Sequence, residues 1–489
     1  LSMAAAKKIL ALGFTPFAII AIDNVMVIAM NAVLQRYGGA QMGDRLGTCA
    51  VIAQSFMLVM TMPLGGISGG TQSILSYNYG ARQFGRVRDA QKKIFRLCMG
   101  FTAIMFVLAR AAGPLFVRLF TKDAQVAEIS AWAIRVCTLA AIPLAELCTL
   151  LFLMIRYGRG KTALMRNVHT CPHVRVYPDK KAIRKDLWKL TAPITLAAAT
   201  MSLVSLVDNF MVINLLKSSG FSQAIAESRF GLMTGYVSPI VYVPLAISSA
   251  LQMSLVPSVS ASLKLKRFSE CNEAAGVGLK LTTIFGLPCM CGLMLLGPLL
   301  LRLIFPGTLA DPDHAAVTDL LMRVMAMALF FLMVTQTCTG ILQGMERQHV
   351  PVWNLVLGLI GKVIVSAVLL KIPSLNVVGA ALGTLICFAL LAVLDLWQVI
   401  RELRVRFSFY EIFGKPALAA LGMTAVVILT MWALSSTQGW VLFTLSTLVG
   451  IFTYAALVVG FHVVTPQDLR MLPGGTRLDF WLREKGIWR

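Results

Sequence analysis

The stretch IDNVMVI at residues 22–28 recurs as VDNFMVI at residues 207–213, and each copy lies inside a long apolar segment. Each copy places one carboxylate, Asp23 or Asp208, beside one amide, Asn24 or Asn209. An ionisable side chain near the middle of a membrane span costs roughly 3 kcal/mol or more, so its default interpretation is functional. The repeat therefore predicts a membrane protein with two related halves.

The composition supports an integral membrane protein. The chain has 489 residues, of which 57% are hydrophobic and 13% charged, and its mean hydropathy is +0.77. A soluble domain carries about 25% charged residues. The net charge of +22 could indicate a nucleic-acid partner. However, the basic residues fall in alternate loops between apolar segments, which is the orientation signal of membrane insertion, so we expect no nucleic-acid partner.

Apolar segments long enough to cross a bilayer predict an all-α fold of about twelve spans. They lie at 10–34, 46–70, 95–117, 128–155, 190–216, 230–257, 277–305, 318–343, 350–371, 377–400, 414–434 and 439–463. The basic loops follow spans two, four, six, ten and twelve, whereas the intervening loops are poor in charge or acidic. The positive-inside rule then predicts a plasma (inner) membrane protein with both termini cytoplasmic.

Two further matches extend the repeat. MPL at 62–64 recurs as VPL at 243–245, and GPLFVRL at 113–119 recurs as GPLLLRL at 297–303, in the same order and at nearly the same spacing. An even number of spans separates the copies, so both run in the same direction through the membrane. This predicts two pseudo-symmetric lobes around a central cavity, as in several secondary transporters.

On these residues the chain resembles the multidrug/oligosaccharidyl-lipid/polysaccharide (MOP) exporter superfamily. Residues 1–155 resemble the C-terminal lobe of a multidrug and toxin extrusion (MATE) transporter, on LQRYGG at 34–39, PLGGISGGTQ at 63–72 and SYNYGA at 76–81. Residues 186–489 resemble flippases of the stage V sporulation protein B and MurJ type. That resemblance rests on APITL at 192–196, SLVPS at 254–258, LQG at 342–344, PVWN at 351–354, VGAALGT at 378–384 and DLRMLPGG at 468–475.

The resemblance implies six helices in each lobe and two more at the end of the flippase branch, but only four spans precede the second lobe here. We therefore expect a four-helix, MATE-like first lobe at 1–155 and a basic cytoplasmic linker at 156–189. We expect these to be followed by a six-helix, flippase-like lobe at 190–400, two additional helices at 401–463 and a basic cytoplasmic tail at 464–489. The short first lobe also leaves open an inactive, truncated or fused chain.

Carboxylates inside the spans are the candidates for ion coupling. Asp23 and Asp208, with Asn24 and Asn209 beside them, and Glu146 in the fourth span could each bind a proton or a cation. The alternative is a purely structural role, in which these groups make hydrogen bonds between helices worth about 1 kcal/mol each.

The ninth span carries a lysine, Lys362, about a dozen residues from its start. Under the flippase interpretation its ammonium would hold the pyrophosphate of a lipid-linked substrate. The alternative is a buried ion pair with Asp395 or Asp208. Asn354, Gln252 and Gln72 complete the candidate cavity residues, whereas Arg229, Arg323 and Arg347 at span edges are expected to be interfacial anchors.

The resemblance implies a secondary transporter and not an enzyme. Its substrate would be a lipid-linked oligosaccharide or polysaccharide precursor, moved by alternating access; the alternative is multidrug efflux by antiport with H⁺ or Na⁺. We expect a coupling ion or the membrane potential as the driving force, contact with membrane lipid, and no cofactor. A metal is not expected either, because the loop with His169, Cys171 and His173 has no evident fourth ligand.

Overall fold

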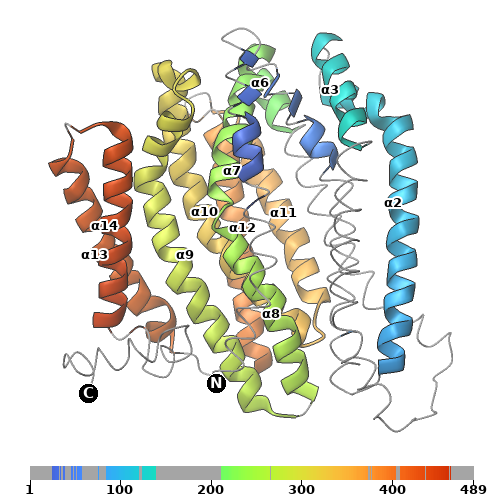
Figure 1. Cartoon of the computed structure of the whole chain (residues 1–489), viewed down its shortest axis with the longest axis vertical. Helices are drawn as coiled ribbons and strands as arrows, with labels where there is room; N and C mark the ends of the chain where they lie inside the picture. Colours follow the sequence, from blue (N-terminus) through green and yellow to red (C-terminus); the bar gives the residue numbers. More distant parts are fainter. Residues whose placement is uncertain are drawn as a thin grey trace, which may run out of the picture. The chain divides into compact units, whose positions relative to one another are not determined.

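The computed structural model describes residues 84–120, 124–138, 211–264, 266–372, 377–403, 408–435 and 437–461, together with short pieces between 22 and 57 and residues 75, 375 and 463. In these residues the chain forms helices and no strand (Figure 1). The long helices are α2 (Phe84–Phe120), α3 (Ala124–Val136), α8 (Leu245–Lys264), α9 (Phe268–Ile304), α10 (Pro312–Gly344), α11 (His349–Leu369), α12 (Val378–Leu403), α13 (Lys415–Ala433) and α14 (Gly439–Gly460). The shorter elements are α6 (Gln223–Gly231), α7 (Ser238–Val241), the π-helical turns η2 (Leu232–Val237) and η4 (Tyr410–Gly414), and the 3-10 turn η3 (Thr308–Ala310).

Eight helices in the described part of the chain are long and apolar enough to cross a membrane. They are Asp89–Arg118, Leu245–Leu263, Phe268–Ile304, Pro312–Gly344, His349–Leu369, Val378–Leu403, Tyr410–Ala433 and Gly439–Gly460. The all-α membrane fold is therefore confirmed. The expected spans at 10–34, 46–70, 128–155 and 190–216 lie wholly or mostly outside the described residues.

The chain forms two compact units, one of residues 1–40 with 212–489 and the other of residues 41–211. In the second unit, α2 and α3 pack with short pieces around residue 50. The rings of Phe56 and Phe116 meet edge to face, with their centroids 5.1 Å apart. Buried apolar residues around them form the core of this unit: Cys49, Ile52, Ala53, Ala109, Val117, Val126 and Ile134. The lobe boundaries expected from the sequence remain a proposal.

The first unit is built around α10, which packs against α8, α9 and α12. A helix that is apolar on all sides is stable only when other helices surround it, and α10 is buried along most of its length. Helix α11 packs mainly on α12, and the α13–α14 hairpin packs on α9 (Figure 1). The described helices of the first unit thus form a bundle around α10.

Close contact between α8 and α10 depends on glycine. A Cβ atom on Gly340 would lie 3.0 Å from both the Cα and the carbonyl oxygen of Gln252. One turn later, a Cβ on Gly344 would lie 3.0 Å from the carbonyl oxygen of Val256. Because backbone atoms cannot rotate away as a side chain can, these positions bring the two helix backbones together.

The expected single span at 230–257 is broken, which corrects the sequence prediction. Helix α6 passes through η2 into α7, and a turn at Tyr242–Pro244 separates α7 from α8. Pro239 and Pro244 have no N–H to donate, so the regular hydrogen-bond pattern cannot continue through this segment. Ser238 Oγ donates to the carbonyl oxygen of Met233 at 2.7 Å, and the same oxygen also accepts the Ser238 backbone N–H. Broken and π-bulged helices inside membrane proteins often lie at functional sites.

Candidate transport site

Helix α11 presents one polar and one apolar face. Asn354, Gly358, Lys362 and Ser366 recur every four residues and therefore lie on one side of the helix; of these, Gly358, Lys362 and Ser366 are buried. The exposed side is apolar throughout: Trp353, Leu357, Ile360, Ile364 and Val368. Helix α11 thus directs its polar stripe into the protein and its apolar side outward, where a bilayer would surround it.

Lys362 is buried inside the first unit. Only 5% of its surface is exposed. It lies thirteen residues after His349, where α11 begins. A Cβ on Gly383 of α12 would lie 2.0 Å from Ser366 Oγ and 3.3 Å from the carbonyl oxygen of Lys362. The glycine therefore lets α12 approach α11 beside the lysine. The sequence predicted a deep ammonium group here, and the structure places it on the packed side of the helix.

Asp395 of α12 is fully buried and accepts a hydrogen bond from Asn354. The distance from Asn354 Nδ2 to Asp395 Oδ1 is 2.7 Å. Asn354, which the sequence suggested as a cavity residue, thus binds the neighbouring helix. The Asn354 amide is thus one donor to Asp395. The ion pair of Lys362 with Asp395 or Asp208, considered from the sequence, stays a prediction.

A second buried polar group joins α8 to α10. Ser248 Oγ and Ser249 Oγ lie 2.7 and 3.1 Å from Gln336 Oε1. One turn along α8, Gln252 lies against Gly340, so this candidate cavity residue is part of the close α8–α10 contact. The contact of Ser248 and Ser249 with Gln336 was not predicted from the sequence, because single polar residues in apolar segments show no pattern of their own.

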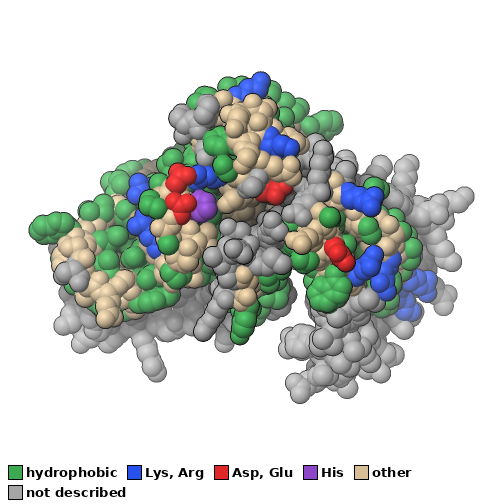
Figure 2. All heavy atoms as spheres, turned by 90° about the horizontal axis from the view of Figure 1, so that it is seen from above, with side chains coloured by type: hydrophobic (Ala, Val, Ile, Leu, Met, Phe, Trp, Pro, Cys, Tyr) green, Lys and Arg blue, Asp and Glu red, His purple; other side chains and the backbone are tan. Residues whose placement is uncertain are grey.

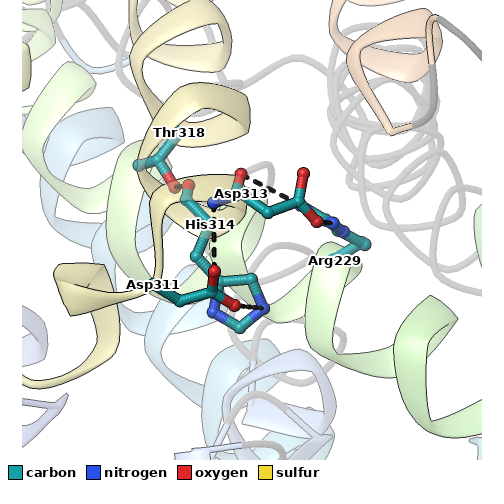
Figure 3. Close-up of polar contacts among 5 residues, drawn as sticks. All are labelled: Arg229, Asp311, Asp313, His314 and Thr318. Atoms are coloured by element: carbon teal, nitrogen blue, oxygen red, sulfur yellow. Dashed lines mark hydrogen bonds and ion pairs between the residues drawn. The ribbon is translucent and has the colours of Figure 1, made fainter.

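Charged side chains of both signs lie at each end of the first unit. The end at the start of α10, here called the acidic end, carries Asp311, Asp313 and Asp319 beside Arg229 and Arg302; the other, here called the basic end, carries Lys266, Arg267, Arg347 and Arg401 beside Glu270 and Glu402. In the end view of Figure 2, acidic side chains and a histidine lie beside Lys and Arg side chains. The same end of α10 is drawn in Figure 3, where Asp311 caps the helix by accepting a hydrogen bond from the Asp313 backbone N–H at 3.0 Å.

Arg229 of α6 is buried and forms an ion pair with the exposed carboxylate of Asp313 (Figure 3). Its guanidinium also donates to the Asp313 carbonyl oxygen at 3.4 Å. On the next residue of α10, His314 Nε2 lies 4.0 Å from Asp311 Oδ2. The sequence suggested only an interfacial anchor at Arg229, but the structure shows a link between α6 and α10.

We expect the two partners of this ion pair to respond unequally to substitution. Asp313→Asn leaves the buried Arg229 guanidinium without its counter-charge, so it is expected to lower stability by about 1–3 kcal/mol. Arg229→Met leaves a carboxylate that is 69% exposed and remains hydrated, so its effect should be smaller. Thermal unfolding of the detergent-solubilised variants measures the difference. Equal effects of the two substitutions would contradict the buried, paired state of Arg229.

The remaining candidates lie outside the described residues. They are Asp23, Asn24, Asp208, Asn209, Glu146 and Gln72. Their roles in ion coupling or in lining a cavity stay predictions. Among the described residues, the buried charged side chains are Arg229, Lys362 and Asp395.

Two family models together match most of the chain. The model described as lipid II flippase MurJ matches residues 173–450, and the MatE model matches residues 17–176. In Bacillus subtilis, the lipid II flippase MurJ is 23% identical over 199 residues, and stage V sporulation protein B is 22% identical over 338 residues. These matches cover 41% and 67% of this chain, but only 36% and 61% of the two relatives.

Solved structures share the fold at low sequence identity. A MOP superfamily transporter from Pyrococcus furiosus, whose binding pocket is described as having reverse polarity, matches with a TM-score of 0.60 at 13% identity. An outward-facing MATE family transporter also matches with a TM-score of 0.60 at 13% identity. Each match covers 82% of this chain and 96% of the other. The fold is therefore that of the MOP superfamily.

Proposed function

Because the chain belongs to the lipid II flippase MurJ family, we propose that it moves a lipid-linked oligosaccharide or polysaccharide precursor across the plasma membrane by alternating access. A MOP superfamily transporter is what the family matches and the fold establish. That the substrate is anionic and lipid-linked is our proposal. Transport would be driven by a coupling ion, H⁺ or Na⁺, or by the membrane potential.

The observation that carries the proposal is the burial of Lys362 within a membrane span. A charged side chain inside a membrane span is costly, and in membrane proteins such groups mark substrate or ion pathways. A pyrophosphate offers several anionic oxygens to an ammonium group, and charge-assisted hydrogen bonds of this kind are about twice as strong as neutral ones.

The broken helix between α6 and α8 supports the alternating-access part of the proposal. The turn at Tyr242–Pro244 interrupts a membrane-spanning segment, and hinges in transporters are short interruptions of this kind. The Arg229–Asp313 pair fixes α6 to α10 on one side of that interruption. Movement of α6 and α7 relative to α8 would open or close the acidic end of the first unit.

The Lys and Arg residues in and beside the loops at the basic end support the expected orientation. Lys266, Arg267, Arg347 and Arg401 lie at the basic end, and such clusters stay on the cytoplasmic side of inner-membrane proteins. The basic end would therefore face the cytoplasm, where lipid-linked precursors are assembled with their headgroups inside. Both termini would lie on that side.

The test compares two substrates in proteoliposomes of the full chain. One preparation holds a fluorescent saccharide linked to a polyprenyl pyrophosphate, and its transfer between leaflets is followed by a membrane-impermeant quencher. The other is loaded with a cationic dye whose efflux is measured. We expect transfer of the lipid-linked saccharide above that of protein-free vesicles and no dye efflux. Dye efflux without lipid transfer would overturn the proposal.

The second candidate function is antiport of cationic drugs. It is favoured by the MatE match at residues 17–176 and by the MATE transporter folds. The acidic residues that such antiport would use, Asp23, Asp208 and Glu146, lie outside the described residues. Dye efflux that depends on an H⁺ or Na⁺ gradient would support this candidate. Absence of both activities would instead favour an inactive chain.

A further inference from the structure

We propose that the buried Asp395 carboxyl is a proton-binding site, reached from the basic end of α12 and coupled to movement of the α11–α12 hairpin. In one state the carboxylate takes up a proton from water and becomes a neutral carboxylic acid; in the other it returns that proton to water. No other bond is formed or broken. The inference rests on the transport function proposed above, and it assigns the coupling to a residue other than Asp23, Asp208 or Glu146.

The first argument is the environment of the two carboxyl oxygens. Asp395 is fully buried, and its Oδ1 accepts the hydrogen bond from Asn354. Its Oδ2 is also buried and has no hydrogen-bond partner among the described residues. An ionised carboxylate with one oxygen unsatisfied in an apolar interior is strongly disfavoured. A proton on Oδ2 removes the charge and leaves the bond from Asn354 to Oδ1 in place.

The second argument concerns the groups that face Asp395. From α10, the Thr339 side chain hydrogen-bonds to the carboxyl and the Cys338 thiol interacts with it electrostatically, but neither carries a positive charge. From α11, the facing group is the amide of Asn354. The lysine of α11, Lys362, lies eight residues further along, or about 12 Å along the helix axis. Within the described part of the chain, no Lys or Arg forms an ion pair with Asp395, so a proton is the simplest means of neutralising it.

The third argument is a row of polar side chains that leads from Asp395 to the basic end. Asp395, Gln398 and Glu402 are spaced by three and four residues, which places them on one face of α12. Gln398 Nε2 donates to Glu402 Oε1 at 3.1 Å, and Arg347 Nε lies 3.4 Å from the same oxygen. The Arg347 side chain is half exposed and that of Glu402 is 23% exposed. The row therefore leads from the buried carboxyl toward the partly exposed side chains of Glu402 and Arg347 at the basic end.

The fourth argument is the position of Asp395 between three helices. The Asn354 bond joins α12 to α11, whereas Cys338 and Thr339 belong to α10. A neutral carboxyl is stable in this packed site, whereas an ionised carboxylate is stabilised when water reaches it. Loss of the proton thus favours a state in which the α11–α12 hairpin separates from α10. Uptake of the proton favours the packed state seen here.

The first experiment detects the proton directly, without any transported substrate. Infrared difference spectra of the full chain in lipid nanodiscs, recorded across a pH series, report the C=O stretch of a protonated carboxyl. We expect such a band in the wild type, its absence in Asp395→Asn, and a shift to higher frequency in Asn354→Ala, because Oδ1 then loses its donor. The proposal would be overturned if the wild-type spectrum had no protonated-carboxyl band, or if Asn354→Ala did not shift that band. This outcome can be read even if Asp395→Asn does not fold.

The second experiment measures coupling in proteoliposomes. We expect lipid transfer by the wild type to respond to a pH gradient, and Asp395→Asn to transfer lipid at a rate that no longer depends on that gradient. Glu402→Gln should slow the response several-fold, whereas Glu270→Gln, at an exposed acid near the start of α9, should behave as the wild type. A gradient response retained in Asp395→Asn, or one to Na⁺ alone, would overturn the proposal. A protonated Asp395 in a chain that transfers no lipid would count against the proposed substrate but not against the proton site.

Discussion

Lys362→Met is expected to reduce transfer of a lipid-linked pyrophosphate substrate by about tenfold to a hundredfold. Methionine keeps most of the length of the lysine side chain and removes its charge, and Lys362 is buried in α11. A hydrogen bond to a charged group is worth about 1.5–3 kcal/mol, and each 1.4 kcal/mol corresponds to about tenfold in rate. The initial rate of transfer in proteoliposomes measures the effect, together with thermal unfolding to confirm that the variant is folded.

Lys371→Met is the matched control for this prediction. Lys371 is exposed just after α11, so its substitution removes one positive charge without touching the buried stripe. We expect wild-type transfer from this control and partial transfer from Lys362→Arg, which keeps the charge but changes its shape. Equal rates for Lys362→Met and Lys371→Met would show that the buried ammonium does not act on the substrate.

Gly340→Leu is expected to destabilise the first unit by about 3 kcal/mol, at the upper end of what overpacking usually costs. The added side chain would begin 3.0 Å from backbone atoms of Gln252, so α8 and α10 would have to separate. That separation would also disturb the contact of Ser248 and Ser249 with Gln336. The midpoint of thermal unfolding in detergent measures the loss.

Gly292→Leu provides the matched control in another membrane-spanning helix. A Cβ on Gly292 of α9 would meet no atom within 4 Å, so the same substitution has open space there. We expect its midpoint to equal or exceed that of the wild type, because glycine is a poor helix former. If the two leucine variants unfolded at the same temperature, Gly340 would not be required for close packing.

The membrane fold was predictable from the sequence because it depends on local properties. Membrane spans can be placed from apolar runs that are long enough to cross a bilayer. The alternation of basic and non-basic loops between these runs then checks the placement. The break in the span at 230–257 was not predicted, although Pro239 and Pro244 are the cause. Two prolines also occur inside α9, at 288 and 298, where the helix continues. Whether a proline breaks a helix thus depends on the packing around it.

The candidate site was predictable only in part. A lysine in the middle of an apolar segment was evident, and Lys362 is indeed buried. The partner of Asn354 was not evident, because Asp395 lies 41 residues away and the contact depends on how α11 packs against α12. Similarly, Arg229 is at the edge of a span in sequence, but Asp313 joins it only in the folded unit. Pairwise contacts between helices are the part that a single sequence does not determine.

The duplicated IDNVMVI and VDNFMVI motif remains the clearest sequence evidence for two related halves. Its aspartates, Asp23 and Asp208, lie outside the described residues, so their coupling roles remain predictions. The second copy of the Pro-Leu match is described and lies at the break before α8.

The most direct test of an anionic lipid-linked substrate is the ratio of two transfer rates measured in the same proteoliposomes. One lipid carries a saccharide on a pyrophosphate, and the other carries the same saccharide on an uncharged linker. We predict that the wild type transfers the pyrophosphate lipid at least tenfold faster and that Lys362→Met largely loses this preference. A wild-type ratio near one, or an undiminished ratio in Lys362→Met, would contradict the account.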